Sequence, residues 1–179
     1  MKRNFPLLNY SAKAANITIM NEIGLDPGID HLTALSMFKK VRESGGKITD
    51  FISWCGGLPS PEASDNPLGY KFSWSPQGVL LATGNNATYL SKGQVIEIPG
   101  INLLSNAEQV SIMKGYSLEG YPNRDSLKYI DTYQLDRDSL KTMFRGTLRY
   151  SGFSQLMNSF KILGLLNRDS LPIQLESWV

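Results

Sequence analysis

The sequence has few of the residues that most often hold metals or carry nucleophilic chemistry. Its 179 residues include one cysteine, Cys55, and one histidine, His31. A single cysteine cannot form a disulfide within the chain, so a reducing compartment is the simpler expectation. Two isolated residues of this kind do not make a zinc site, so no metal is predicted. The patterns G-x-G-x-x-G and G-x-x-x-x-G-K-[ST] are absent from the sequence, so no dinucleotide or nucleoside triphosphate signature is recognisable.

Charge of one sign and long apolar runs are also scarce. The 18 Lys and Arg nearly balance the 16 Asp and Glu, which leaves a formal net charge of +2. A nucleic-acid binder needs a basic patch or stripe, so we expect no nucleic acid as partner. No apolar run approaches the ~20 residues that cross a bilayer, so we expect no membrane partner either. The apolar content of 41% is nevertheless enough for a packed core.

Hydrophobic patterning predicts helices and strands that follow one another along the chain. Apolar residues recur at helical spacing in segments that we predict to be helices: 29–44, 105–113, 126–133 and 153–163. β-Branched and aromatic residues predict strands over the segments 17–20, 47–54, 70–74, 88–90, 94–98, 116–120 and 141–150. The predicted fold class is therefore α/β (α+β), a mixed β-sheet with flanking helices.

Asp26-Pro27-Gly28 stands immediately before the predicted helix over 29–44 and has two interpretations. In the first, Asp26 is the N-cap and Pro27 takes the first helical position. In the second, the Asp26 carboxylate lies at the mouth of a binding site, as side chains at strand-to-helix junctions often do. The two roles are compatible with each other.

Cys55 also lies at a junction, because it follows a predicted strand and precedes Gly56-Gly57. Glycines at this point let a ligand approach the backbone closely. A lone cysteine is more often a small buried residue than a reactive one, so both interpretations stay open.

The strand over 141–150 predicts two unlike faces. Phe144, Gly146, Leu148 and Tyr150 fall on one face, and Arg145, Thr147 and Arg149 fall on the other. The two arginines are about 13 Å apart at ~3.3 Å per residue, so they suit different carboxylates of a long ligand. Arg124, in a predicted turn, is a candidate for a third guanidinium. The alternative is that all three arginines are solvated surface charges.

Five stretches, in order along the chain, resemble the saccharopine dehydrogenase family. They are NEIGLDPGIDH (21–31), WCGGLPSPE (54–62), NPLGYKFSWS (66–75), YPNRDS (121–126) and RGTLRY (145–150). The resemblance covers roughly residues 12–166, and the tryptophan at position 54 replaces the tyrosine usual in the family. Segments around Ser75-Pro76 and over 163–168 are most similar to the animal bifunctional aminoadipate-semialdehyde synthases, with the single-function fungal enzymes close behind.

The resemblance implies NAD(P)-dependent oxidation of saccharopine to glutamate and 2-aminoadipate 6-semialdehyde. It assigns the substrate-binding role to the residues that match the family's saccharopine site: Asp26, Cys55, Arg124, Thr147, Leu148 and Arg149. Ser75 matches a position beside the nucleotide, and Asp26 is by position the candidate for the catalytic base. The alternative function is a non-catalytic substrate-binding or dimerisation module derived from that enzyme.

The resemblance also implies a domain organisation. We expect residues 1–22 to be the end of a Rossmann domain, 23–166 to be the substrate-binding domain and 167–179 to start a helical region. Most of the Rossmann domain would then be missing, so NADP or NAD would be bound mainly outside this chain and the chain alone would be inactive. The expected location is the cytoplasm, or the mitochondrial matrix if the parent is an animal bifunctional enzyme. A homodimer is left open.

Overall fold

The computed structural model describes residues 5–21 and 23–167, and the chain divides into two compact units, Met1–Gly45 and Gly46–Val179. Among the described residues, no helix combines the length and the apolarity needed to cross a bilayer. The predicted start of a helical region at 167–179 lies outside the described residues except for its first position. The predicted domain boundaries therefore stay a prediction.

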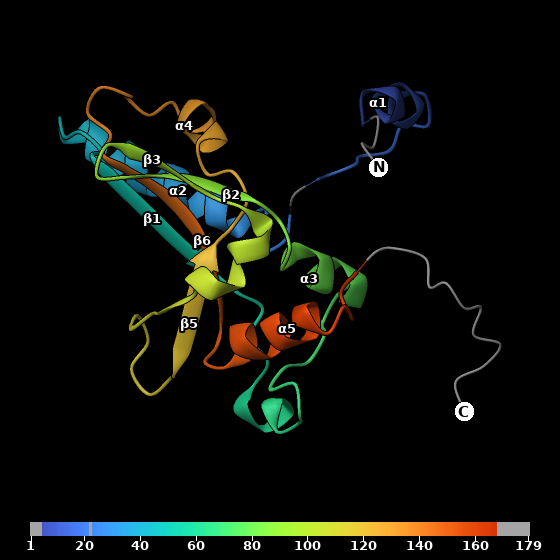
Figure 1. The fold of residues 1–179 in the computed structure, drawn as a ribbon. Helices are drawn as coiled ribbons and strands as arrows, with labels where there is room; N and C mark the ends of the chain where they lie inside the picture. Colours follow the sequence, from blue (N-terminus) through green and yellow to red (C-terminus); the bar gives the residue numbers. More distant parts are fainter. Residues whose placement is uncertain (1–4, 22, 168–179) are drawn as a thin grey trace. The chain divides into compact units, whose positions relative to one another are not determined.

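The first unit contains helices α1 (Phe5–Ala14) and α2 (Ile29–Glu43) (Figure 1). Helix α2 confirms the prediction for 29–44, and it ends before Gly45, which has a φ of 74°. The strand predicted over 17–20 is wrong, because this segment is exposed and forms no strand. A strand requires a hydrogen-bonded neighbour, and the bridge recorded among the described residues of this unit joins Gly24 to Gly28.

The second unit is built on a mixed six-stranded sheet. Its strands are β1 (Asp50–Cys55), β2 (Ala87–Ser91), β3 (Gln94–Ile98), β4 (Glu108–Gln109), β5 (Leu118–Pro122) and β6 (Thr142–Tyr150). Strand β6 pairs with β1 in parallel and with both β2 and β5 antiparallel, so three strands meet on it (Figure 1). The predicted fold class, a mixed sheet with helices, is confirmed.

The helices of this unit are α3 (Pro76–Ala82), α4 (Lys128–Thr132) and α5 (Phe153–Ile162). The largest buried cluster joins α3, α5, the β2–β3 hairpin and the loop before α3 through Tyr70, Val79, Ala87, Ile98, Leu103, Leu104, Tyr121, Phe153 and Met157. A buried carboxylate fixes the start of α5, because Glu119 of β5 accepts the backbone N–H groups of Gly152 (2.9 Å) and Ser154 (2.5 Å). Negative charge at a helix N-terminus is stabilising.

Two further predicted elements are wrong, the first because of a local side-chain bond and the second because of pairing with a distant strand. The segment 70–74 is not a strand: Asn66 Nδ2 donates to the carbonyl of Tyr70 (3.0 Å), which holds the segment as a loop. The segment 105–113 is not a helix, since it contains a 3₁₀ turn (Leu104–Asn106) and β4. There the N–H of Val110 donates across to the carbonyl of Leu118 (2.9 Å), so the backbone pairs with β5.

Candidate functional site

The register of β1 on β6 places Cys55 directly beside Thr147. Partners in register point to the same face of a sheet, so both share a face with Arg145 and Arg149 two residues away on β6. On the antiparallel side, Tyr121 of β5 is opposite Thr147 and Glu119 is opposite Arg149. The predicted alternation along β6 is therefore confirmed, and the face with Arg145, Thr147 and Arg149 is buried at both arginines rather than open to solvent.

The turn after Cys55 lies against β6. A Cβ built on Gly56 would overlap the carbonyl of Leu148, so the glycine permits this close approach of two backbones. The next residue, Gly57, is exposed. Four predicted site residues are brought together here: Cys55, Thr147, Leu148 and Arg149.

Arg149 is not a solvated charge, since its exposed fraction is 6%. Its guanidinium carbon lies 5.3 Å from the ring centroid of Tyr70 and 5.2 Å from that of Phe153, which is the geometry of a cation–π contact. Nη1 donates to the carbonyl of Leu148 (2.8 Å). Nε has no hydrogen-bond partner among the residues that the structure describes.

Arg145 is also buried, with 5% exposed, so the interpretation as a surface charge is wrong for it too. Its guanidinium carbon lies 4.2 Å from the ring centroid of Tyr129, and its backbone N–H donates to Ser126 Oγ (3.0 Å). The aromatic rings explain the burial of both arginines, because a weakly hydrated guanidinium stacks well on an aromatic face.

Two residues of β5 that sequence reasoning missed complete this polar face. Burial raises the pKa of Tyr121, and the nearby Arg149 guanidinium opposes part of that rise. Glu119 supplies a buried negative charge, with both oxygens used at the start of α5. The sequence signal that could have identified them is a glutamate within a short, mostly apolar strand. Glu119 and Tyr121 are two residues apart, so they lie on the same face of that strand.

Asp26 lies in the first unit and does not take the N-cap position of α2. That position is Gly28, whose N–H donates to Asp30 Oδ1 (2.8 Å), and Pro27 stands outside the helix. The capping prediction is wrong because the chain turns once more before the helix: the N–H of Ile29 reaches back to the carbonyl of Gly24 (2.9 Å). Asp26 is exposed.

Arg124 is exposed and lies in the turn after β5, with a φ of 51°. Its carbonyl accepts the N–H of Thr88 (2.8 Å), and the neighbouring Asn123 N–H donates to the carbonyl of Arg145 (2.8 Å). Arg124 is therefore near the Arg145 end of this face, whereas Arg149 is at the other end.

Ser75 is the N-cap of α3, as predicted, and Pro76 follows at the first position. Its Oγ accepts the N–H of Gly78 (3.1 Å), and the side chain is exposed. The hydroxyl proton of Ser75 is not used in that bond, so the group keeps a donor for an oxygen of another molecule.

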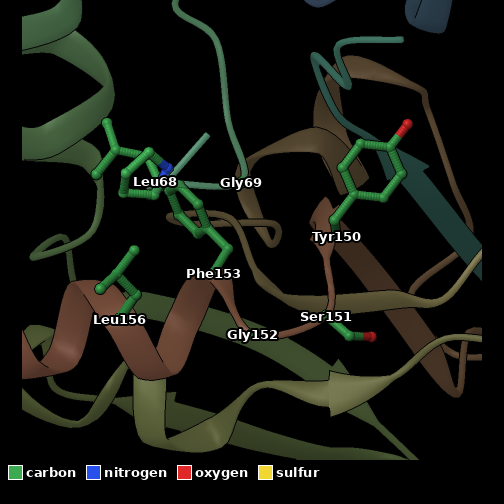
Figure 2. Close-up of a pocket in the computed structure, with 8 residues that line it drawn as sticks. Leu68, Gly69, Tyr150, Ser151, Gly152, Phe153 and Leu156 are labelled. Carbon is green, nitrogen blue, oxygen red and sulfur yellow. The ribbon is translucent and has the colours of Figure 1, made fainter. Parts of the chain in front are cut away.

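A cavity of about 300 Å³ lies between the loop before α3 and the start of α5. Figure 2 shows Leu68, Phe153 and Leu156 on one side of it and Tyr150 and Ser151 on the other. The Tyr150 hydroxyl donates to the carbonyl of Pro59 (2.7 Å). None of the predicted site residues lines this cavity, so it is not the candidate site.

The described part of the chain contains no group of three His, Cys, Asp or Glu placed to bind a metal ion. The candidate site is the polar face of β1, β5 and β6. It combines one thiol (Cys55), two hydroxyls (Thr147 and Tyr121), one buried carboxylate (Glu119) and two buried guanidinium groups (Arg145 and Arg149). The excess of positive charge suits binding of an anionic ligand.

The chain is similar to known proteins in both sequence and structure. The pattern of the saccharopine dehydrogenase C-terminal domain matches residues 24–179. Saccharopine dehydrogenase [NADP(+), L-glutamate-forming] from Pyricularia oryzae is 48% identical over 170 residues, which is 95% of this chain and 37% of that protein. The mitochondrial alpha-aminoadipic semialdehyde synthase of Bos taurus is 48% identical over 92% of this chain and 18% of its own length.

A solved structure agrees with these matches. It is the apo histidine-tagged saccharopine dehydrogenase (L-Glu forming) from Saccharomyces cerevisiae, with a TM-score of 0.78 and 49% identity over 87% of this chain and 35% of that one. The chain thus spans little more than a third of the fungal relatives and less than a fifth of the bovine one.

Proposed function

Because the chain belongs to the saccharopine dehydrogenase C-terminal domain family, we propose that it forms the saccharopine-binding part of an NADP-dependent, L-glutamate-forming saccharopine dehydrogenase. The fungal relatives are named as NADP(+)-dependent enzymes, which favours NADP over NAD as the cofactor. The bovine relative is named as a mitochondrial protein. This supports a location in the mitochondrial matrix if the chain comes from an animal bifunctional enzyme.

The observation that carries the proposal is the buried Arg149 guanidinium. Burial of a cation is costly unless it is paired, and Nε of Arg149 has no partner among the described residues. The Glu119 carboxylate on the same face is committed to two backbone N–H groups of the α5 turn. A carboxylate of the ligand would supply the acceptor that Nε lacks, and such charge-assisted bonds are the strong ones.

The other predicted residues fit a long ligand that lies along this face. Cys55 and Thr147 would form the floor of the site between the two arginines, and the backbone of Leu148 would border it. Arg124 lies near the Arg145 end, and Arg145 is about 13 Å from Arg149 along β6 at ~3.3 Å per strand residue. Saccharopine has three carboxylates, so guanidinium groups at both ends suit it better than they suit a short amino acid.

In the parent reaction, NADP supplies the hydride acceptor for the carbon next to the secondary amine of saccharopine. Ser75 is the residue of this chain that would contact the nucleotide, with the hydroxyl proton that its capping bond leaves unused. Asp26 would accept the proton of the substrate amine or of the water that hydrolyses the resulting imine. Asp26 is exposed and is not the N-cap of α2, so helix capping does not account for the carboxylate at this position.

The proposal is tested by thermal unfolding of the chain with and without saccharopine. A ligand that binds the folded state stabilises it by RT ln(1 + L/Kd), where L is the free ligand concentration, so the melting temperature rises with the logarithm of ligand concentration above Kd. We expect saccharopine to raise it and L-lysine, which has one carboxylate, to leave it unchanged. Absence of any rise would contradict substrate binding, and a dimer that forms without ligand binding would instead favour the non-catalytic module.

A further inference from the structure

The hydroxyl of Tyr70 is a buried polar group that the fold itself leaves unused. Tyr70 is 4% exposed, and its hydroxyl has no hydrogen-bond partner among the described residues. Buried tyrosines ordinarily find a partner for this group, because desolvation without a bond is unfavourable. The ring of Tyr70 is explained by packing, since it contacts Phe72 and Phe153 at centroid distances of 5.3 Å each. The hydroxyl is not explained by packing.

The space in front of this hydroxyl is bounded by Gly57. A Cβ built on Gly57 would lie 3.9 Å from the Tyr70 hydroxyl oxygen and 4.0 Å from Ser73 Oγ. Apart from Gly57 and its two chain neighbours, no other atom of the described residues lies within 4 Å of that Cβ position, so the side of Gly57 that faces the two hydroxyls is loosely packed. Gly57 and Ser73 are exposed, so this space borders the solvent.

The same surroundings hold a cation with one unused donor. The Arg149 guanidinium carbon is 5.3 Å from the Tyr70 ring centroid, and its Nε is the second partnerless donor of this region among the described residues. The nearby carboxylate, Glu119, is already used by Gly152 and Ser154. Two hydroxyl donors and a guanidinium close to the loosely packed side of Gly57 are complementary to a carboxylate oxygen.

We propose that Tyr70, assisted by Ser73, binds a carboxylate oxygen of the ligand in the space beside Gly57. This inference rests on the proposed function, because the ligand is the polycarboxylate that Arg149 is proposed to bind. It adds a residue that discriminates between ligands. A ligand without a carboxylate at this position would leave the Tyr70 hydroxyl buried and unpaired, so it would bind more weakly. It also gives a reason for the glycine at position 57, since any side chain there would fill the space.

The experiment compares Tyr70→Phe and Gly57→Ala with Tyr116→Phe as the matched control. Tyr116 is exposed at 43% and stacks on Tyr150. Saccharopine affinity is measured by calorimetric titration, and stability by thermal unfolding without ligand. We expect Tyr70→Phe to weaken saccharopine binding about 10-fold, the effect of one hydrogen bond to a charged group. Its melting temperature should stay the same or rise, because the change removes a polar group that the fold does not satisfy.

Gly57→Ala should weaken binding as well while leaving the melting temperature unchanged, since its Cβ makes only ordinary contacts. Tyr116→Phe should change neither quantity. Unchanged affinity in Tyr70→Phe, together with weakened binding in Arg149→Ala, would overturn this inference and leave the proposed function intact. A lowered melting temperature with unchanged affinity would assign the hydroxyl to an internal bond and overturn it too. A wild-type chain that does not bind saccharopine would overturn both.

Discussion

The backbone of Gly56 lies directly against the carbonyl group of Leu148, so closely that a Cβ at Gly56 would overlap it. This contact joins the end of β1 to the middle of β6. It holds Cys55 beside Thr147 and leaves the exposed Gly57 as the next residue of the turn.

The contact predicts opposite outcomes for two neighbouring glycines. Gly56→Ala should lower the free energy of unfolding by about 1–3 kcal/mol, because the overlapping atoms belong to the backbone and to Cβ of Leu148 and cannot rotate away. Gly57→Ala should change it by less than about 0.5 kcal/mol. Urea unfolding of the two variants measures this difference. Equal losses in both would show that the turn does not pack on β6 in this way.

The three arginines are not equally buried, and their alanine variants should differ in saccharopine affinity and in melting temperature. Arg149→Ala and Arg124→Ala should each weaken saccharopine binding by about 10- to 150-fold, which corresponds to about 1.5–3 kcal/mol for a charge-assisted bond. Arg145→Ala should weaken it less, because Arg145 is not among the residues predicted to bind the substrate.

Stability separates the same variants. Arg124→Ala should keep the wild-type melting temperature, since this side chain is exposed, whereas Arg149→Ala should lower it by removing a buried group from between two rings. Calorimetric titration and thermal unfolding provide the two measurements. Wild-type affinity in both Arg124→Ala and Arg149→Ala would exclude them from the site.

Asp26 provides a test of chemistry without a change of fold. Because Gly28 is the N-cap of α2, Asp26→Asn should leave the melting temperature unchanged. The proposed proton transfer predicts a lower kcat and an altered pH profile in the same variant. The measurement is saccharopine oxidation with NADP by the chain joined to the nucleotide-binding domain of a relative. Full activity in Asp26→Asn would remove the residue from the reaction.

Tyr121 predicts how stability depends on alkaline pH. Burial raises the folded-state pKa of this hydroxyl above its ordinary value of about 10. The unfolded chain therefore releases the proton first, so stability is fully present below about pH 10 and is lost as pH rises toward the folded-state pKa. Tyr121→Phe should lose less free energy of unfolding between about pH 9 and about pH 11 than the wild type. An unchanged alkaline slope in urea unfolding would contradict the burial of this hydroxyl.

The sequence predicted the parts of the site that depend on local patterns. Alternation along β6 assigned Arg145, Thr147 and Arg149 to one face, because a strand places successive side chains on opposite sides. Ser75 and Pro76 likewise gave the start of α3 from their own chemistry.

The parts that were missed depend on residues distant in sequence. Nothing local to Arg149 indicates that Tyr70 will stack on it, and nothing local to Gly57 indicates that the Tyr70 hydroxyl faces it. The segment 105–113 was predicted to be a helix because its pairing with β5 is set by the sheet rather than by its own sequence.

The most direct test of the account is calorimetric titration of saccharopine into the folded wild-type chain and into Arg149→Ala. The account predicts that one saccharopine binds per wild-type chain, with affinity at least about 10-fold weaker in the variant. No detectable binding to the folded wild-type chain, or equal affinity in the two, would contradict it.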